Sequence, residues 1–200
     1  MTEFASLTSD DFELYAGQME QIKARIKAAA GFFEPPNVYP SVEAGLLQLR
    51  LALETLVLSS LVTNRKAVEA VSTAFAKKEH KDAFKLAKEL NPAFWPVPCT
   101  QIHDDDGEVI EMRAIAGGHL TEDEYLPTWG RLSAWLHATN PFQTMPEPSV
   151  GATYGIQVAR KLVVLLDHHY LSLLERGESM VCMMNEANSG RVHTFGFEPA

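Results

Sequence analysis

The chain has 200 residues, of which 46% are hydrophobic and 22% are charged, and its formal net charge is −9. This composition is typical of a globular protein with a proper core, and the acidic balance disfavours non-specific binding to polyanions. The acidic N-terminus lacks an apolar signal core, and no apolar run approaches the roughly 20 residues that cross a bilayer. We therefore expect one cytoplasmic domain over residues 1–200 without membrane contact; two smaller domains are the alternative.

The cysteines and the acidic runs show no pattern of a metal or cofactor site. Cys99 and Cys182 form neither a disulfide framework nor a zinc motif, and each lies in a strand-like stretch, so we expect two small core residues. The acidic run at residues 104–106 lacks the rest of a calcium-loop pattern. Phosphate-binding glycine loops, dinucleotide fingerprints and zinc-protease motifs are absent from the sequence as well. The sequence therefore predicts no metal and no cofactor.

Two long helices are expected at the start of the chain. Apolar residues recur three and four apart over residues 9–30, which predicts an amphipathic helix. Residues 41–62 carry two apolar stripes, which predict the central helix of a bundle, buried on two sides. Its polar residues Glu43, Arg50 and Glu54 share one face. That face is either a narrow solvent-exposed strip or the wall of a cleft in which Arg50 and Glu54 bind a small ligand.

The middle of the chain is expected to add two shorter helices and a hairpin. Residues 64–79 and 81–90 have helical periodicity, and Asn91-Pro92 ends the second helix. Residues 95–103 and 108–115 flank an Asp-Gly pair, which predicts a β-hairpin. Positive charges concentrate over residues 65–88 and negative charges over residues 103–124. Either both segments are solvent-exposed charged faces, or the positive segment is a basic strip that binds phosphate.

A well-delimited helix is expected after residue 120. Thr121 and Glu124 have the spacing of a capping box, and Asn140-Pro141 is expected to end the helix. A further helix is predicted over residues 153–175 from a stripe at helical spacing, and within it His168 and His169 would point about 100° apart. Residues 179–184 and 191–197 then predict a second hairpin.

These elements predict a mainly α fold, a helical bundle with two short β-hairpins. The bundle would comprise residues 9–90 and 121–175, with a β-hairpin insert at 95–115 and a C-terminal β-hairpin at 178–198. An isolated hairpin is unstable in water, so the two hairpins either pair into one small sheet or lie separately on the bundle.

The segment from Arg131 to His137, RLSAWLH, is the strongest functional motif in the chain. It resembles the signature of the HEPN superfamily, an Arg, four to six residues and a His late in a helical bundle. The stretch from Glu43 to Glu54 also looks like the first core helix of that superfamily. The resemblance covers residues 9–175 and leaves the hairpins as additions.

The resemblance implies metal-independent cleavage of RNA, in which the 2′-hydroxyl attacks the neighbouring phosphorus. Arg131 and His137 would then be the catalytic residues. His137 would move the proton, because histidine titrates near neutral pH, and Arg131 would brace the phosphorane oxygens with its planar fork of donors. The resemblance also implies a homodimer that brings two such pairs together, with RNA as the partner, in a toxin or phage-defence role.

Two alternatives stay open at this stage. Six residues of ideal helix would leave Arg131 and His137 roughly 120° apart, so they converge only if the helix ends early or a second chain contributes. Otherwise His137 caps the last helical turn and Arg131 lies on the surface. Leu132 stands where active members commonly carry a polar residue. The apolar Leu132 favours another hypothesis, in which the protein is a non-catalytic module that binds a protein partner or a nucleotide.

Overall fold

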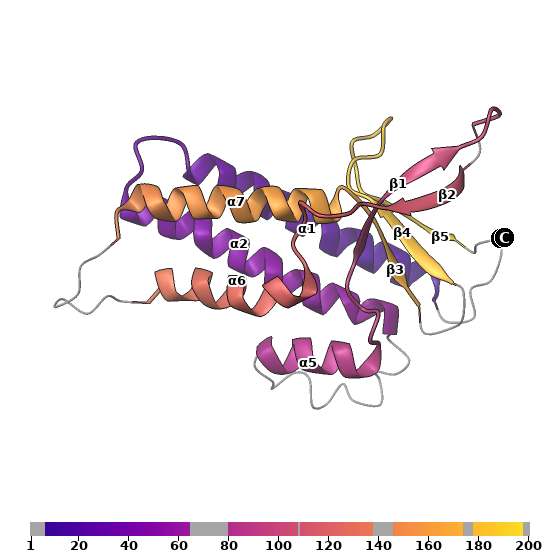
Figure 1. Cartoon of the computed structure of the whole chain (residues 1–200), viewed down its shortest axis with the longest axis horizontal. Coiled ribbons are helices and arrows are strands. Elements are labelled where there is room, and N and C mark those ends of the chain that lie inside the picture. Colours follow the sequence, from indigo (N-terminus) through magenta and orange to yellow (C-terminus); the bar gives the residue numbers. More distant parts are fainter. Residues whose placement is uncertain (1–6, 65–79, 108, 138–145, 174–177, 198–200) are drawn as a thin grey trace.

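The computed structural model describes residues 7–64, 80–107, 109–137, 146–173 and 178–197. These residues form a bundle of four long helices with a five-stranded sheet at one end and a shorter helix below (Figure 1). The prediction of a mainly α fold, a helical bundle with two short β-hairpins, is therefore wrong, and the protein has a mixed α/β fold with one five-stranded antiparallel sheet. The helix expected over residues 64–79 lies outside the described residues, as does much of the basic strip.

The first two helices form an antiparallel pair, α1 (Ser9–Phe32) and α2 (Tyr39–Ser60), followed by a 3₁₀ turn at Val62–Asn64. At the start of α1, the Asp11 carboxylate accepts hydrogen bonds from the Thr8 amide (2.9 Å) and hydroxyl (2.7 Å). These hydrogen bonds satisfy polar groups at the start of the helix that have no partner within it. The expected central position of the second helix is confirmed, because α2 contacts α1, α6, α7 and α5.

The remaining helices cover other sides of α2. They are α5 (His80–Leu90), α6 (Glu122–Trp135) and α7 (Pro148–Leu166). The capping box of α6 is confirmed: Thr121 accepts from the Glu124 amide at 3.3 Å, and the Glu124 carboxylate accepts from the Thr121 amide at 3.2 Å. The stacked rings of Phe84 and Tyr125, 4.8 Å apart, join α5 to α6.

The sheet is antiparallel throughout, with the order β2-β1-β3-β4-β5. Both expected hairpins are confirmed, as β1 (Val97–His103) with β2 (Val109–Ala114) and as β4 (Ser179–Met183) with β5 (His193–Phe197). Strand β3 (His168–Ser172) pairs with β1 on one side and β4 on the other, so it joins the two hairpins into one sheet. Cys99 and Cys182 are buried on β1 and β4 as free thiols, as expected.

The helix expected over residues 153–175 is wrong at both ends. Helix α7 begins at Pro148 and ends at Leu166, and the chain then continues as strand β3. On β3, His169 and Leu171 are buried, whereas His168 and Tyr170 are half-buried, which is the alternation of a strand. Leu166, Tyr170 and Leu173 are also four and three apart, so the same apolar residues fit a helical stripe.

Close helix packing depends on one aromatic ring between two glycines. Phe33, which is 4% exposed, packs against Gly45 of α2 and Gly155 of α7. A Cβ at Gly45 would lie 2.5 Å from the ring, and a Cβ at Gly155 would lie 2.2 Å from it. Only glycine therefore lets α2 and α7 approach the end of α1 so closely.

Candidate functional site

Arg131 lies on the exposed side of α6, and its guanidinium is placed over an aromatic ring of α7. Its Cζ is 4.0 Å from the centroid of the Tyr154 ring, within the range of a cation–π contact. Burial raises the pKa of Tyr154, and a hydrogen bond to Thr128 and the charge of Arg131 partly offset this effect. The contact fixes the guanidinium against one face of the ring and leaves donors for another group.

A hollow of about 300 Å³ lies beside this cation–π pair. It is open to solvent, and polar side chains predominate in its lining of Arg131, Ser149, Val150, Thr153, Tyr154 and Gln157. All of these except Arg131 come from the first three turns of α7. Glu147, the N-cap residue of α7, makes no side-chain cap hydrogen bond, so the partial positive charge of this helix end adds to the charge of Arg131, although the Glu147 carboxylate offsets part of it. The hollow thus suits a small anionic group.

His137 does not belong to the helix that carries Arg131. Helix α6 ends at Trp135, five residues before the expected stop at Asn140, which lies outside the described residues. Leu136 is the C-cap, with φ −92° and ψ −3°. His137 follows with an exposed side chain that makes no hydrogen bond to any residue the structure describes. The ideal-helix separation of about 120° therefore does not apply to this pair.

Trp135 helps to set the position of this end of α6. Its ring atoms lie 3.1 Å from the place that a Cβ of Gly151 would take, so the ring packs directly onto the first turns of α7. The C-terminal end of α6 and the N-terminal end of α7 consequently lie at the same end of the molecule (Figure 1). Arg131, the hollow and His137 all belong to this end. The structure leaves both expected catalytic side chains exposed, and it adds Tyr154 as a partner of Arg131.

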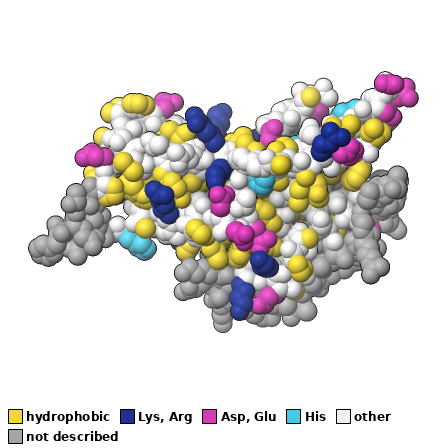
Figure 2. Space-filling view, viewed as in Figure 1, with side chains coloured by type: hydrophobic (Ala, Val, Ile, Leu, Met, Phe, Trp, Pro, Cys, Tyr) yellow, Lys and Arg dark blue, Asp and Glu magenta, His cyan; other side chains and the backbone are white. Residues whose placement is uncertain are grey.

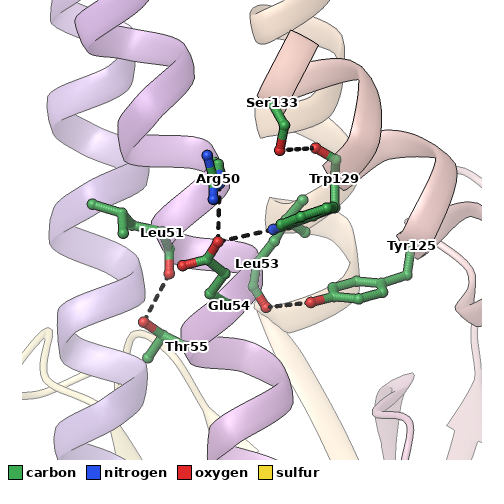
Figure 3. A network of polar contacts seen from close by, with 8 residues as sticks. All are labelled: Arg50, Leu51, Leu53, Glu54, Thr55, Tyr125, Trp129 and Ser133. Carbon is green, nitrogen blue, oxygen red and sulfur yellow. Dashed lines mark hydrogen bonds and ion pairs between the residues drawn. The ribbon is translucent and has the colours of Figure 1, made fainter. Parts of the chain in front are cut away.

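Arg50 and Glu54 form a contact between helices rather than an open strip. Glu54 Oε1 accepts hydrogen bonds from Arg50 Nε and from Trp129 Nε1, each at 2.9 Å (Figure 3). The Arg50 Cζ also lies 5.0 Å from the centroid of the Trp129 ring. Both charged side chains are half-buried, and their contacts run to α6 and not to the hairpins. These contacts link α2 to α6, and ligand binding by Arg50 and Glu54 stays a prediction.

A second polar network is fully buried between α1 and the sheet. The Tyr15 hydroxyl lies 2.7 Å from His169 Nε2, and His169 Nδ1 lies 2.9 Å from the Leu166 carbonyl oxygen. A carbonyl oxygen only accepts, so Nδ1 carries the proton and Nε2 accepts from Tyr15. Burial, above all, lowers the pKa of His169 to about 4 and raises the pKa of Tyr15. The two neutral side chains have hydrogen-bond partners in each other and in the Leu166 carbonyl, and they form part of the core.

One face of the molecule carries charged side chains of both signs. Figure 2 shows cationic and anionic groups interspersed on the face that it presents, with no broad patch of one sign. Within the described ranges, no three His, Cys, Asp or Glu side chains are placed so that they could hold a metal ion. Among the same residues, no helix has the length and apolar character needed to cross a membrane.

The sequence contained no direct signal for Tyr154. It lies 23 positions after Arg131, and the predicted helix began at Thr153, which left out the turn that carries Ser149 and Val150. A polar or aromatic residue in the first turns of the following helix was the available indication, since two consecutive antiparallel helices bring those turns beside the end of the preceding helix. The chain matches no protein-family model, no curated protein and no solved structure.

Proposed function

We propose that this protein is a metal-independent endoribonuclease of the cytoplasm, HEPN-like in its Arg–His pair, with Arg131 and His137 as catalytic residues. The observation that supports the proposal most directly is the exposed Arg131 guanidinium, fixed over Tyr154 beside a hollow, with the exposed His137 beyond the same helix end. RNA is the substrate, and a toxin or phage-defence role is consistent with such an activity.

The chemistry needs one cation and at least one proton carrier. Arg131 binds the non-bridging oxygens of a phosphodiester, whose charge grows as the phosphorane forms. His137 takes the proton from the 2′-hydroxyl, whose oxygen then attacks the adjacent phosphorus. The P–O5′ bond breaks, and the products are a 2′,3′-cyclic phosphate and a free 5′-hydroxyl. The leaving 5′-oxygen needs a proton as well, and a second His137 in a homodimer supplies it.

The size of the hollow and its chemistry agree with this assignment. The phosphate would lie between Arg131 and the start of α7, where the guanidinium is the main source of positive charge and the helix end, partly offset by the Glu147 carboxylate, is a weaker one. Within the same lining, the Gln157 amide offers a donor and an acceptor for a ribose or a base edge, and the Thr153 hydroxyl, which donates to the Ser149 carbonyl, can still accept. The net charge of −9 would make RNA binding depend on these local contacts rather than on the whole surface.

The test uses pure protein, labelled single-stranded RNA and excess EDTA. Wild-type protein is expected to cleave the RNA, whereas His137→Ala and Arg131→Ala are expected to lose at least about a hundredfold in rate. His103→Ala is the matched control, because His103 is also an exposed histidine and lies on the β1–β2 hairpin. Cleavage that survives in both site variants, or that disappears equally in the control, would rule out these roles.

A second candidate function is binding of a nucleotide without cleavage, in a module that also engages a protein partner. The hollow beside Arg131 favours it, because that hollow is complete without His137. Titration calorimetry with nucleoside monophosphates separates the two. Binding that requires Arg131 but not His137, in a protein that cuts no RNA, would support the second function over the first.

A further inference from the structure

A long apolar groove runs between α1 and α7, and no residue of α2 lines it. Figure 1 shows α1 and α7 next to α2 in the bundle. Between α1 and α7 lie two hollows of about 520 Å³ and about 230 Å³. The hollows share Ile26, Ala30 and Val163, so they are neighbouring parts of one groove. The larger extends toward Phe33 and Ile156, and the smaller toward Met184.

The groove exposes apolar surface that the fold itself does not use. Val163 is 47% exposed and Ile156 is 36% exposed, although both lie on a helix with a well-packed inner face. Ala30 and Ala159 line the groove with short side chains, which gives it depth. Exposed apolar residues that line one continuous groove, rather than being scattered singly, indicate a surface that another molecule covers.

The spacing of the hollows fits a helix better than a flexible chain. Along α7, the centre of the lining shifts by roughly four residues from one hollow to the other, which is about 6 Å of helix, whereas along α1 the two linings overlap more. This is the rise between side chains at i and i+4 on a helix that lies along the groove. Val163 lines both hollows and is exposed, so its side chain lies where the two hollows meet.

The rims of the groove are cationic on both sides. Lys27 on α1 and Arg160 on α7 are exposed, and neither has an ionic partner in the portion of the chain that the structure describes. Lys23 is already engaged, with Glu20 at 3.1 Å and with two backbone carbonyls. Asp167 is the one acidic residue among those that line the two hollows. The groove is therefore complementary to an occupant with acidic flanks.

We infer that the α1–α7 groove binds an amphipathic helix of a partner protein. Two apolar side chains of that helix, one turn apart, occupy the hollows on either side of Val163. Acidic side chains on its flanks face Lys27 and Arg160. The inference rests on the groove alone and holds whether or not the protein cleaves RNA.

A selection from a displayed library tests this inference. Full-length protein is used to sort a yeast-displayed library of helical peptides of about 16 residues, a length at which a helix is marginally stable in water. Enriched peptides are expected to carry apolar residues at i and i+4 with acidic flanks. Fluorescence anisotropy then measures each peptide against variants of the protein.

The variants exploit two residues of equal exposure. Val163→Glu is expected to weaken binding at least tenfold, whereas Leu14→Glu, at a residue also 47% exposed on α1 but outside the groove, is expected to leave it unchanged. Arg160→Glu is expected to weaken binding of acidic peptides and to strengthen binding of the same peptides with lysine flanks.

Four results would overturn the inference. The first is a library that yields no binder sensitive to Val163→Glu. The second is enrichment of basic peptides or of peptides without the i, i+4 pattern. The third is a Val163-dependent affinity for dodecanoate with none for helical peptides, which would make the occupant an acyl chain. The fourth is self-association in analytical ultracentrifugation that Val163→Glu abolishes, which would make the occupant a second copy.

Discussion

The buried Tyr15–His169 pair makes the stability of the fold depend on pH in a defined window. His169 is fully buried and its pKa is lowered to about 4 from an ordinary 6.5, mainly by burial. In the unfolded chain the same histidine binds a proton below its ordinary pKa. Acidification therefore favours the unfolded state, because that state binds more protons between the two pKa values.

The size of the effect follows from the shift. Each pKa unit corresponds to 1.36 kcal/mol, so the shift of His169 is worth about 3 kcal/mol. This stability is fully present above pH 6.5, declines as the pH falls toward 4, and does not decline further below that value. Against a typical total of about 5–15 kcal/mol, such a loss is large.

Urea unfolding at a series of pH values between 7.5 and 4 measures this loss. The comparison is with His169→Gln, whose amide oxygen can accept from Tyr15 but does not titrate in this range. The variant should be less stable at pH 7.5, and the difference from wild type should shrink as the pH falls. His168→Gln is the control: burial also lowers the pKa of His168, but that side chain is only half-buried, so its effect should be smaller. A wild-type-minus-variant difference that stays constant with pH would refute the assigned role of His169.

Two further substitutions test the helix packing. Gly155→Ala should cost about 2–4 kcal/mol of unfolding free energy, because its Cβ would lie 2.2 Å from the Phe33 ring. Gly17→Ala on α1 is its control. Apart from the local backbone of α1, no heavy atom of the described residues lies within 4 Å of that Cβ, so the variant should gain up to about 1 kcal/mol of unfolding free energy. Equal effects of the two substitutions in thermal unfolding would contradict the packing. Trp129→Phe should cost about 1 kcal/mol, because Glu54 loses its indole donor, and an unchanged urea midpoint would contradict that contact.

The elements that were correctly predicted are those with local signals. Apolar residues three and four apart identified α1 and α2, and the Thr121–Glu124 capping box identified the start of α6. The Asp-Gly pair identified the β1–β2 hairpin, where Gly107 has φ +86°. In each case the residues that specify the element lie within a few positions of one another, so the sequence alone carries the information.

Strand β3 could not be predicted in this way, because long-range pairing decides its conformation. Its partner Val97 lies more than seventy residues before Tyr170, and its apolar residues fit a helix as well as a strand. The missed strand is the one that joins the hairpins, so a single local error changed the fold class. Another contact that no local pattern predicts lies at the end of α6, where Trp135 packs onto Gly151 of α7.

The candidate site was predictable only in part. Arg131 and His137 were selected from their spacing, and the structure leaves both side chains exposed. Tyr154 and the hollow beside it depend on how α7 packs against α6, so they required the tertiary structure. Arg50 and Glu54 were selected from their shared helix face, and the structure adds Trp129, which their spacing could not reveal.

The most direct test of the proposed function is the chemistry of the RNA ends. A labelled DNA oligonucleotide with one internal ribonucleotide is incubated with wild-type protein in EDTA, and the products are identified by mass spectrometry. We predict cleavage after the ribonucleotide, with a 2′,3′-cyclic phosphate on one fragment and a 5′-hydroxyl on the other, and no cleavage when that position carries a 2′-O-methyl group. An intact substrate, or fragments with a 3′-hydroxyl and a 5′-phosphate, would contradict a reaction in which the RNA's own 2′-oxygen is the nucleophile.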